Sequence, residues 1–171
     1  MLLVEPTLEY DRAVQAFRRD FLDGGDMDGS GSLLRYARTQ DWLDALEAGK
    51  HAETVAPGKV PATQYVFVRE EDGKIVGVLQ IRHYLNDYLE QYAGHIGYSV
   101  CPSERRKGYA TRMLAAGLEK CRERGMERVL LCCRPANEGS RRTILHNGGV
   151  WESTVWVPDR ETCLERYWIT L

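Results

Sequence analysis

Residues 100–111 read VCPSERRKGYAT and connect a strand-like run, His95–Val100, to a helix-like run, Thr111–Arg122. The turn between them places three cationic side chains and a glycine at the N-terminus of a helix. Unpaired backbone N–H groups and the helix dipole favour an anion at such a position. Gly108 has no Cβ to hold a ligand away from the backbone, and small Ala110 keeps the next turn open. The segment is therefore predicted to bind a phosphate or a diphosphate.

Length and composition describe an ordinary globular domain. The 171 residues suit one domain, 1–171, in which 43% of the residues are hydrophobic and 28% are charged. The formal net charge of −2 creates no strong field toward nucleic acid or an anionic membrane. No apolar run approaches the ~18 residues of a transmembrane helix, and the N-terminus lacks the basic segment of a signal peptide. We expect a cytoplasmic protein that binds neither nucleic acid nor membrane.

Apolar spacing and turn residues predict a mixed order of strands and helices. Strands are expected at 2–5, 64–69, 74–83, 94–100, 129–133, 150–157 and 164–171. Helices are expected at 8–22, 33–46, 111–124 and 138–146, with a loop or short helix at 86–93. Because hairpins dominate and crossovers are few, this order implies an α/β (α+β) fold with a mixed sheet flanked by helices.

The sequence offers no convincing metal site. The five cysteines are irregularly spaced and no Cys/His set has zinc spacing, so they are predicted to be reduced and mostly buried thiols. The loop Asp23–Gly31 has some likeness to a calcium loop, but Leu34 occupies the twelfth position, which requires glutamate. We therefore expect no bound metal.

The phosphate turn lacks both the Walker pattern and the dinucleotide fingerprint. Instead, Arg105-x-x-Gly108-x-Ala110, preceded by V-x-P, resembles motif A of the GNAT superfamily of N-acetyltransferases. The resemblance covers nearly the whole chain and is densest over 64–152. It implies a mixed, centrally splayed sheet of about seven strands flanked by about four helices. It also implies acetyl-CoA as cosubstrate and direct transfer of the acetyl group to a primary amine of a small molecule or peptide.

In that family the pantetheine arm of the cofactor lies in the gap of the splayed sheet. The resemblance implies main-chain contacts from Tyr98, Ser99 and Val100. The diphosphate would be wrapped by Arg105, Arg106, Lys107, Gly108, Tyr109, Ala110 and Thr111. A second family signature, N-x-x-S, places Asn137 and Ser140 beside the cofactor, although Asn137 fits a helix N-cap equally well.

The catalytic groups are less clearly marked. By resemblance, the Val100 N–H stabilises the oxyanion. His95 is the best candidate base because an unperturbed pKa near 6.5 suits neutral pH, with Glu90 as a second candidate and a bound water as a third. The position of the family's usual tyrosine acid holds Ile144. The segment 147–152, N-G-G-x-x-E in pattern, resembles a bacterial subgroup of the family.

Several alternatives stay open at this stage. The missing tyrosine at Ile144 would also suit a catalytically silent acyl-CoA-binding or regulatory module, and the turn would suit an unrelated nucleotide-binding α/β protein. Aromatic and acidic residues of the first two helices and the last hairpin would suit a cationic amine or belong to the core. Domains of this family often pair through their last strands, so a homodimer is also an expectation.

Overall fold

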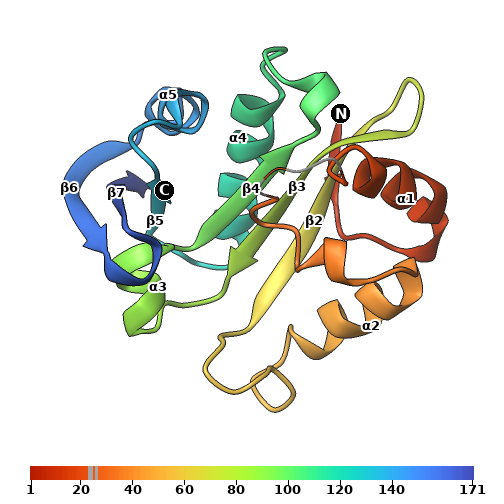
Figure 1. Cartoon of the computed structure of the whole chain (residues 1–171), viewed down its shortest axis with the longest axis horizontal. Coiled ribbons are helices and arrows are strands. Elements are labelled where there is room, and N and C mark those ends of the chain that lie inside the picture. The colour runs from red at the N-terminus through yellow and green to blue at the C-terminus, as the bar shows by residue number, and fades with distance from the viewer. Residues whose placement is uncertain (23–24, 26) are drawn as a thin grey trace.

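The computed structural model describes residues 1–22, 25 and 27–171, and its strands form two sheets (Figure 1). The first sheet has the order β1-β2-β3-β4 and consists of Leu2–Val4, Ala62–Arg69, Lys74–Arg82 and Ile96–Val100. The second has the order β5-β7-β6, with β5 Arg128–Cys133, β6 Val150–Val157 and β7 Thr162–Thr170. The helices are α1 Asp11–Arg19, α2 Thr39–Ala48, α3 Asp87–Tyr92, α4 Tyr109–Glu123 and α5 Glu138–His146.

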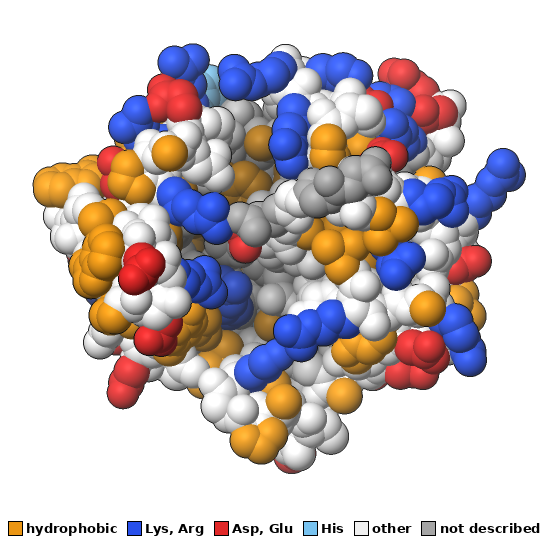
Figure 2. Space-filling model, in the orientation of Figure 1, with side chains coloured by type: hydrophobic (Ala, Val, Ile, Leu, Met, Phe, Trp, Pro, Cys, Tyr) orange, Lys and Arg blue, Asp and Glu red, His pale blue; other side chains and the backbone are white. Residues whose placement is uncertain are grey.

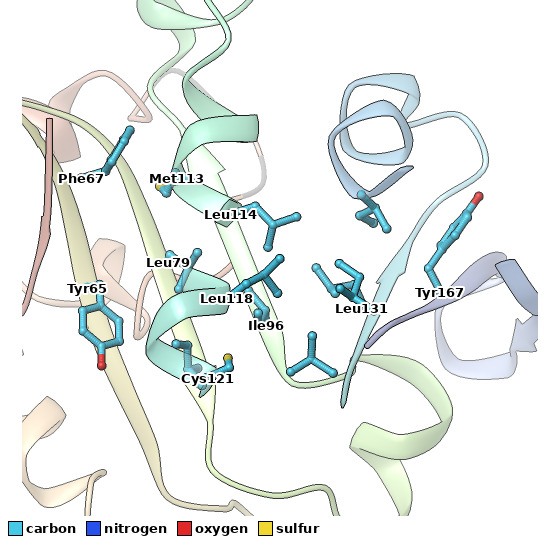
Figure 3. Close-up of a cluster of buried hydrophobic side chains, with 14 of the residues drawn as sticks. Tyr65, Phe67, Leu79, Ile96, Met113, Leu114, Leu118, Cys121, Leu131 and Tyr167 are labelled. Atoms are coloured by element: carbon cyan, nitrogen blue, oxygen red, sulfur yellow. The ribbon is translucent and has the colours of Figure 1, made fainter. Parts of the chain in front are cut away.

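Two hydrophobic clusters cover the two faces of the first sheet. On one face, which we call the front, α1 and α2 pack through Phe17 and Trp42 against Val66 of β2. On the other face, the back, α4 supplies Leu114 and Leu118, which lie between the two sheets (Figure 3). Because each strand alternates its side chains, both faces of β2 and β3 are buried and both strands are almost continuously apolar.

The two sheets meet only at one end of β4 and β5 within the described chain. An isolated bridge joins Gly94 to Leu131, and the His95 N–H donates to the Leu130 carbonyl over 2.7 Å (N···O). Beyond that contact β4 and β5 separate, which leaves a space that we call the gap. The predicted seven-stranded, centrally splayed arrangement is therefore confirmed.

The predicted helix at 33–46 is wrong in its first half. Leu33–Arg35 forms a single 3₁₀ turn, and Tyr36 and Arg38 are extended before α2 begins at Thr39. The Gln15 side chain donates to the Ala37 carbonyl, so a tertiary contact takes the place of a helical bond there. The helix expected at 8–22 is likewise divided into a 3₁₀ turn and α1, and 86–93 contains the short α3.

Asp23, Gly24 and Asp26 of the predicted calcium-like loop lie outside the described residues. Among the residues described, no three His, Cys, Asp or Glu side chains gather as a metal-binding set. All five cysteines are free thiols, and three of them are buried. No helix in the described ranges is long and apolar enough to cross a bilayer.

Candidate functional site

The backbone of β4 presents hydrogen-bonding groups to the gap at every second residue. At its two ends, His95 accepts from a β3 N–H over 2.8 Å and Cys101 donates to a β3 carbonyl over 2.9 Å (N···O). Opposed residues of two antiparallel strands alternate between hydrogen-bonded and non-hydrogen-bonded pairs. The backbone groups of the odd-numbered residues of β4 are therefore hydrogen-bonded to β3. The N–H and C=O groups of Tyr98 and Val100 therefore face the gap. The main chain of Ser99 is turned to β3 instead.

The N-terminus of α4 is an uncapped cluster of N–H groups beside the end of β4. Gly108 is its N-cap residue at φ 76°, and no side chain caps the helix. The first helical bond runs from the Arg112 N–H to the Gly108 carbonyl, so the amides of 109–111 have no partner within the helix. A Cβ on Gly108 would meet no atom of the described residues within 4 Å, so they leave the space in front of the turn open. These features fit a diphosphate.

A buried carboxylate beneath the turn was not foreseen from the sequence. Glu104 is 5% exposed and receives Lys74 Nζ at 2.8 Å, Lys107 Nζ at 2.9 Å and Arg69 Nη1 at 3.1 Å. The hydrogen bonds from Lys74 and Lys107 lower the Glu104 pKa to about 2. The alternation of charges in 103–107 gave no sign that this glutamate would be covered. The Lys107 ammonium is thus held by Glu104 and leaves only its backbone to the turn.

The two arginines of the turn differ in their surroundings. Arg105 Nε donates to the Val100 carbonyl over 3.3 Å, which ties the turn to the gap-facing edge of β4. Arg106 is exposed and adopts φ 64°, a left-handed conformation that is uncommon outside glycine. Strain of this kind concentrates at binding sites.

On the far side of the gap, α5 begins with the second signature. The Asn137 side chain accepts from the Ser140 N–H over 3.0 Å and so serves as an N-cap. The Tyr98 hydroxyl reaches from β4 to Ser140 Oγ at 2.8 Å, and burial raises the pKa of Tyr98 to about 12. Ile144 is completely buried in the back cluster. The family's usual acid position is thus part of the core.

The motif after α5 ties that helix to α4. Asn147 Nδ2 donates to the Thr111 carbonyl over 3.2 Å and to the Thr143 carbonyl over 2.9 Å. A Cβ on Gly149 would lie 2.4 Å from an Ile144 methyl carbon, so a larger residue would collide there. Asn147 and Gly149 of this pattern are therefore explained by their structural roles, a hydrogen bond between two helices and a close contact with Ile144.

His95 lies at the closed end of the gap. Its Nδ1 accepts from the Leu130 N–H over 2.9 Å, which assigns the proton of the neutral ring to Nε2. Burial, with the charges of Arg82 and Arg128, lowers the His95 pKa to about 4. The neutral ring therefore has no free lone pair while the bond to Leu130 persists. Glu90 is exposed and lines a shallow hollow of about 460 Å³ beside His95 and Trp168.

The loop between α1 and α2 seats against the front of β4. Asp28 O accepts from Ser99 Oγ over 2.8 Å, and the backbones of Gly29 and Gly97 are in direct contact. Figure 2 shows a hollow at the centre of this face with Lys and Arg side chains along its border. The gap is thus packed by helices at the back and opens at the front.

The sequence matches the model of the acetyltransferase (GNAT) family over residues 32–148. No curated protein matches it. Among solved structures, RimJ of Mycobacterium smegmatis in complex with CoA-disulfide is similar, with a TM-score of 0.67, 24% identity, and coverage of 98% of this chain and 80% of that one. RimL, a ribosomal L7/L12 alpha-N-protein acetyltransferase in complex with coenzyme A, has a TM-score of 0.70 and 15% identity, and the match covers 99% and 93% of the two chains. A variant of spermidine N-acetyltransferase SpeG from Vibrio cholerae has a TM-score of 0.64 and 13% identity, with 99% and 95% covered.

The family match spans most of the chain, including the turn, the gap and the start of α5. The described fold, with seven strands in two sheets, is similar to these solved structures over nearly the whole chain. This chain belongs to the GNAT family of acetyltransferases and transfers an acetyl group from acetyl-CoA to an amine.

Proposed function

We propose that the pantetheine arm of acetyl-CoA lies in the gap and pairs with the main chain of Tyr98 and Val100. The diphosphate is bound by the backbone amides of 108–111. The observation that carries this assignment is the uncapped N-terminus of α4, open in front of Gly108 and next to the gap-facing edge of β4. Asn137 and Ser140 border the same space from α5. The Val100 N–H stabilises the oxyanion of the attacked thioester, since it points into the gap.

The acceptor is a primary amine of a small molecule or of a peptide, and it attacks the thioester directly. An amine panel with detection of released coenzyme A tests this proposal. Turnover on at least one amine is expected. Tight coenzyme A binding with no turnover on any amine would instead support the silent binding module, and stabilisation by ATP exceeding that by acetyl-CoA would support a nucleotide-binding protein.

Removing both arginines of the turn is expected to weaken cofactor binding. Charge-assisted hydrogen bonds contribute ~1.5–3 kcal/mol each, so Arg105→Ala with Arg106→Ala should reduce acetyl-CoA affinity about tenfold or more. Calorimetric titration measures the effect. The control is Lys120→Ala with Arg122→Ala, which removes the same charge from the other end of α4. Equal losses in both pairs would mean that the turn binds no phosphate.

Because His95 Nδ1 is engaged by β5, we take Glu90 rather than His95 as the base that accepts the amine proton, with a bound water as the alternative. His95→Asn places an amide oxygen near the position of Nδ1 and removes Nε2, so it should keep the bond to Leu130. We expect kcat/KM to stay within about threefold at neutral pH, whereas loss of a general base costs about a hundredfold or more. Glu90→Gln, measured beside it, is expected to show the larger loss. A hundredfold loss in His95→Asn without a change in melting temperature would restore His95 as the base.

The same variant has a pH signature. A ring whose pKa is lowered to about 4 binds its proton more weakly in the folded chain than in the unfolded chain, where the pKa is about 6.5. Its contribution to the free energy of unfolding is therefore complete above about pH 6.5 and is lost as the pH falls toward 4. Urea unfolding between pH 4 and 7.5 should show a flatter decline for His95→Asn than for the wild type.

Three further assignments concern the subgroup, the oligomeric state and the cellular compartment. The hydrogen bonds of Asn147 and the buried Ile144 support membership of the N-G-G-x-x-E subgroup. If proteins of that subgroup carried tyrosine at the position of Ile144, this assignment would be contradicted. Trp151 and Trp156, 57% and 56% exposed on the edge strand β6, support a homodimer, which sedimentation measures. The free thiols favour the cytoplasm, which cell fractionation tests.

A further inference from the structure

Two arginines, one from each sheet, lie on the face of the strands opposite the back cluster, because their neighbours Ile81 and Tyr167 belong to that cluster. Arg82 ends β3, and its Nη2 lies 3.6 Å from the position that a Cβ on Gly97 would take, over the front of β4. Arg166 of β7 pairs with Cys132 of β5 across the second sheet. The raised pKa of the Cys132 thiol, about 12, is due to burial and is opposed by the charges of both Arg166 and Arg82. Geometry agrees with this, because Arg82 bonds the Gly94 carbonyl and Gly94 bridges Leu131, the neighbour of Cys132 in β5. Both arginines therefore lie near the same part of β5 beside the gap.

Neither guanidinium is fully paired by the described residues. Arg82 donates through Nη1 to the carbonyls of Gly94 at 2.9 Å and Ala93 at 3.4 Å, and forms no ion pair with a described carboxylate. Burial lowers its pKa, and Asp28 acts on it only at longer range. Arg166 is 16% exposed and meets Glu152 through Nη2 at 3.1 Å. Its Nε is buried without a hydrogen-bond partner in the described chain.

A covered guanidinium group without an anion is costly, because desolvation is not repaid by an ion pair. The planar fork of arginine matches a carboxylate, which accepts two parallel N–H bonds. The back of the gap is packed by α4 and by the contact of Tyr98 with Ser140. An acceptor must therefore enter at the front, where these two arginines lie.

The sequence left open a different acceptor, a cationic amine held by aromatic and acidic side chains of the first two helices and the last hairpin. Three tryptophans of these segments lie elsewhere. Trp42 is completely buried in the front cluster, and Trp151 and Trp156 lie exposed on the edge strand β6. The side chains at the front of the gap are instead cationic, in keeping with the border of the hollow in Figure 2.

From this juxtaposition we infer that Arg82 and Arg166 bind a carboxylate of the acceptor, so the amine acetylated by this protein belongs to a molecule that also carries an acidic group. This inference rests on the proposed function, because it places the acceptor at the front of the same gap. Two sources supply such chemistry, a free amino acid and a peptide with an acidic residue near its N-terminus.

Matched acceptors test the inference with the full-length protein. Free amino acids are compared with their amides, and peptides beginning Ser-Asp are compared with peptides beginning Ser-Asn. We expect the acidic member of a pair to have a kcat/KM about tenfold higher or more, since a site built for a polar group rejects the analogue that lacks it. A preference confined to the free amino acids or to the peptides identifies the source. Equal values within every pair, or a preference for polyamines, would overturn the inference while leaving the acetyltransferase assignment intact.

The variant Arg82→Gln keeps a donor for the Gly94 carbonyl and removes the charge. It should raise KM for the acidic acceptor about tenfold and keep KM for the neutral acceptor of the same pair within about twofold of the wild-type value. Arg82→Lys should recover part of the loss. The affinity for coenzyme A, measured by calorimetry, should not change, because Arg82 lies away from the phosphate turn.

A binding measurement keeps the test decisive if no amine is turned over. N-acetylglutamate and N-acetylglycine are titrated into the complex of the protein with coenzyme A, beside N-acetylglycinamide as the neutral control. The carboxylates should bind to the wild type and bind about tenfold more weakly to Arg82→Gln. No difference between carboxylate and amide would reject the anion site, whereas binding without turnover would reject only the proposed transfer.

Discussion

Gly108→Val is expected to reduce the affinity for acetyl-CoA roughly a hundredfold or more, about 2.8 kcal/mol, in a chain that remains folded. Gly108 has φ 76°, and a Cβ on it would lie more than 4 Å from every other part of the chain that the structure describes. A valine side chain would fill that space and hold the diphosphate away from the amides of 109–111. Calorimetric titration of coenzyme A, with thermal unfolding of both proteins, measures the change.

The same helix provides the control. Gly125 follows the C-terminus of α4 at φ 74°, and a Cβ there also meets nothing within 4 Å. Gly125→Val therefore imposes the same left-handed strain, roughly 1–2 kcal/mol, without a ligand in front of it. We expect the two variants to lose similar stability and only Gly108→Val to lose the cofactor. Wild-type affinity in Gly108→Val would remove the diphosphate from the N-terminus of α4.

Gly29→Ala is expected to have the largest effect on the fold of the site. A Cβ on Gly29 would lie 1.9 Å from the Gly97 carbonyl oxygen, and its φ of 67° is already unfavourable for alanine. The loop would have to leave β4, which breaks the bonds from Ser99 Oγ to Asp28 O and from Gln64 Nε2 to Gly29 O. Strain and overpacking together should cost roughly 2–4 kcal/mol. Urea unfolding measures the loss, and kcat/KM should fall because this loop packs against β4 beside the front opening of the gap.

Gly73→Ala is the matched substitution for that experiment. Gly73 lies in the turn between β2 and β3 with the same φ of 67°, but a Cβ there meets no atom within 4 Å. It should lose only the strain, about 1–2 kcal/mol, and retain full activity. If Gly29→Ala proved no less stable than Gly73→Ala, the close contact of the loop with β4 would be wrong.

Local sequence was sufficient for the features that depend on neighbouring residues. The turn before Gly108 and the hairpin at Asp72 and Gly73 were predicted because glycine and capping preferences act within a few residues. The splayed sheet came from the family resemblance, since no local pattern marks where two strands part. The helix at 33–46 was overextended because its apolar residues were assigned to one helical face, although the structure divides them between a 3₁₀ turn and α2.

The remaining site residues needed tertiary information. Glu104 looked like one charge among several, and only the fold brings Lys74 and Arg69 to it from β3 and β2. His95 was predicted as a base from the ordinary pKa of histidine, but burial lowers its pKa, and the Leu130 N–H occupies its Nδ1. Arg82 lies in a segment, 82–86, that resembles the subgroup, but the sequence gave it no role in the site, because nothing in the sequence relates the end of β3 to Cys132 of β5.

The bond of His95 to Leu130, at one end of the gap, has a consequence for binding energetics. This bond and the Gly94 bridge hold β4 and β5 together at one end. Leu114 and Leu118 of α4 pack between the two sheets at the back. The protein forms this opening without the cofactor. An arriving thioester therefore finds free backbone hydrogen-bonding groups and does not have to break hydrogen bonds between strands. Preorganisation of this kind lowers the entropic cost of association and leaves more of the contact energy for affinity.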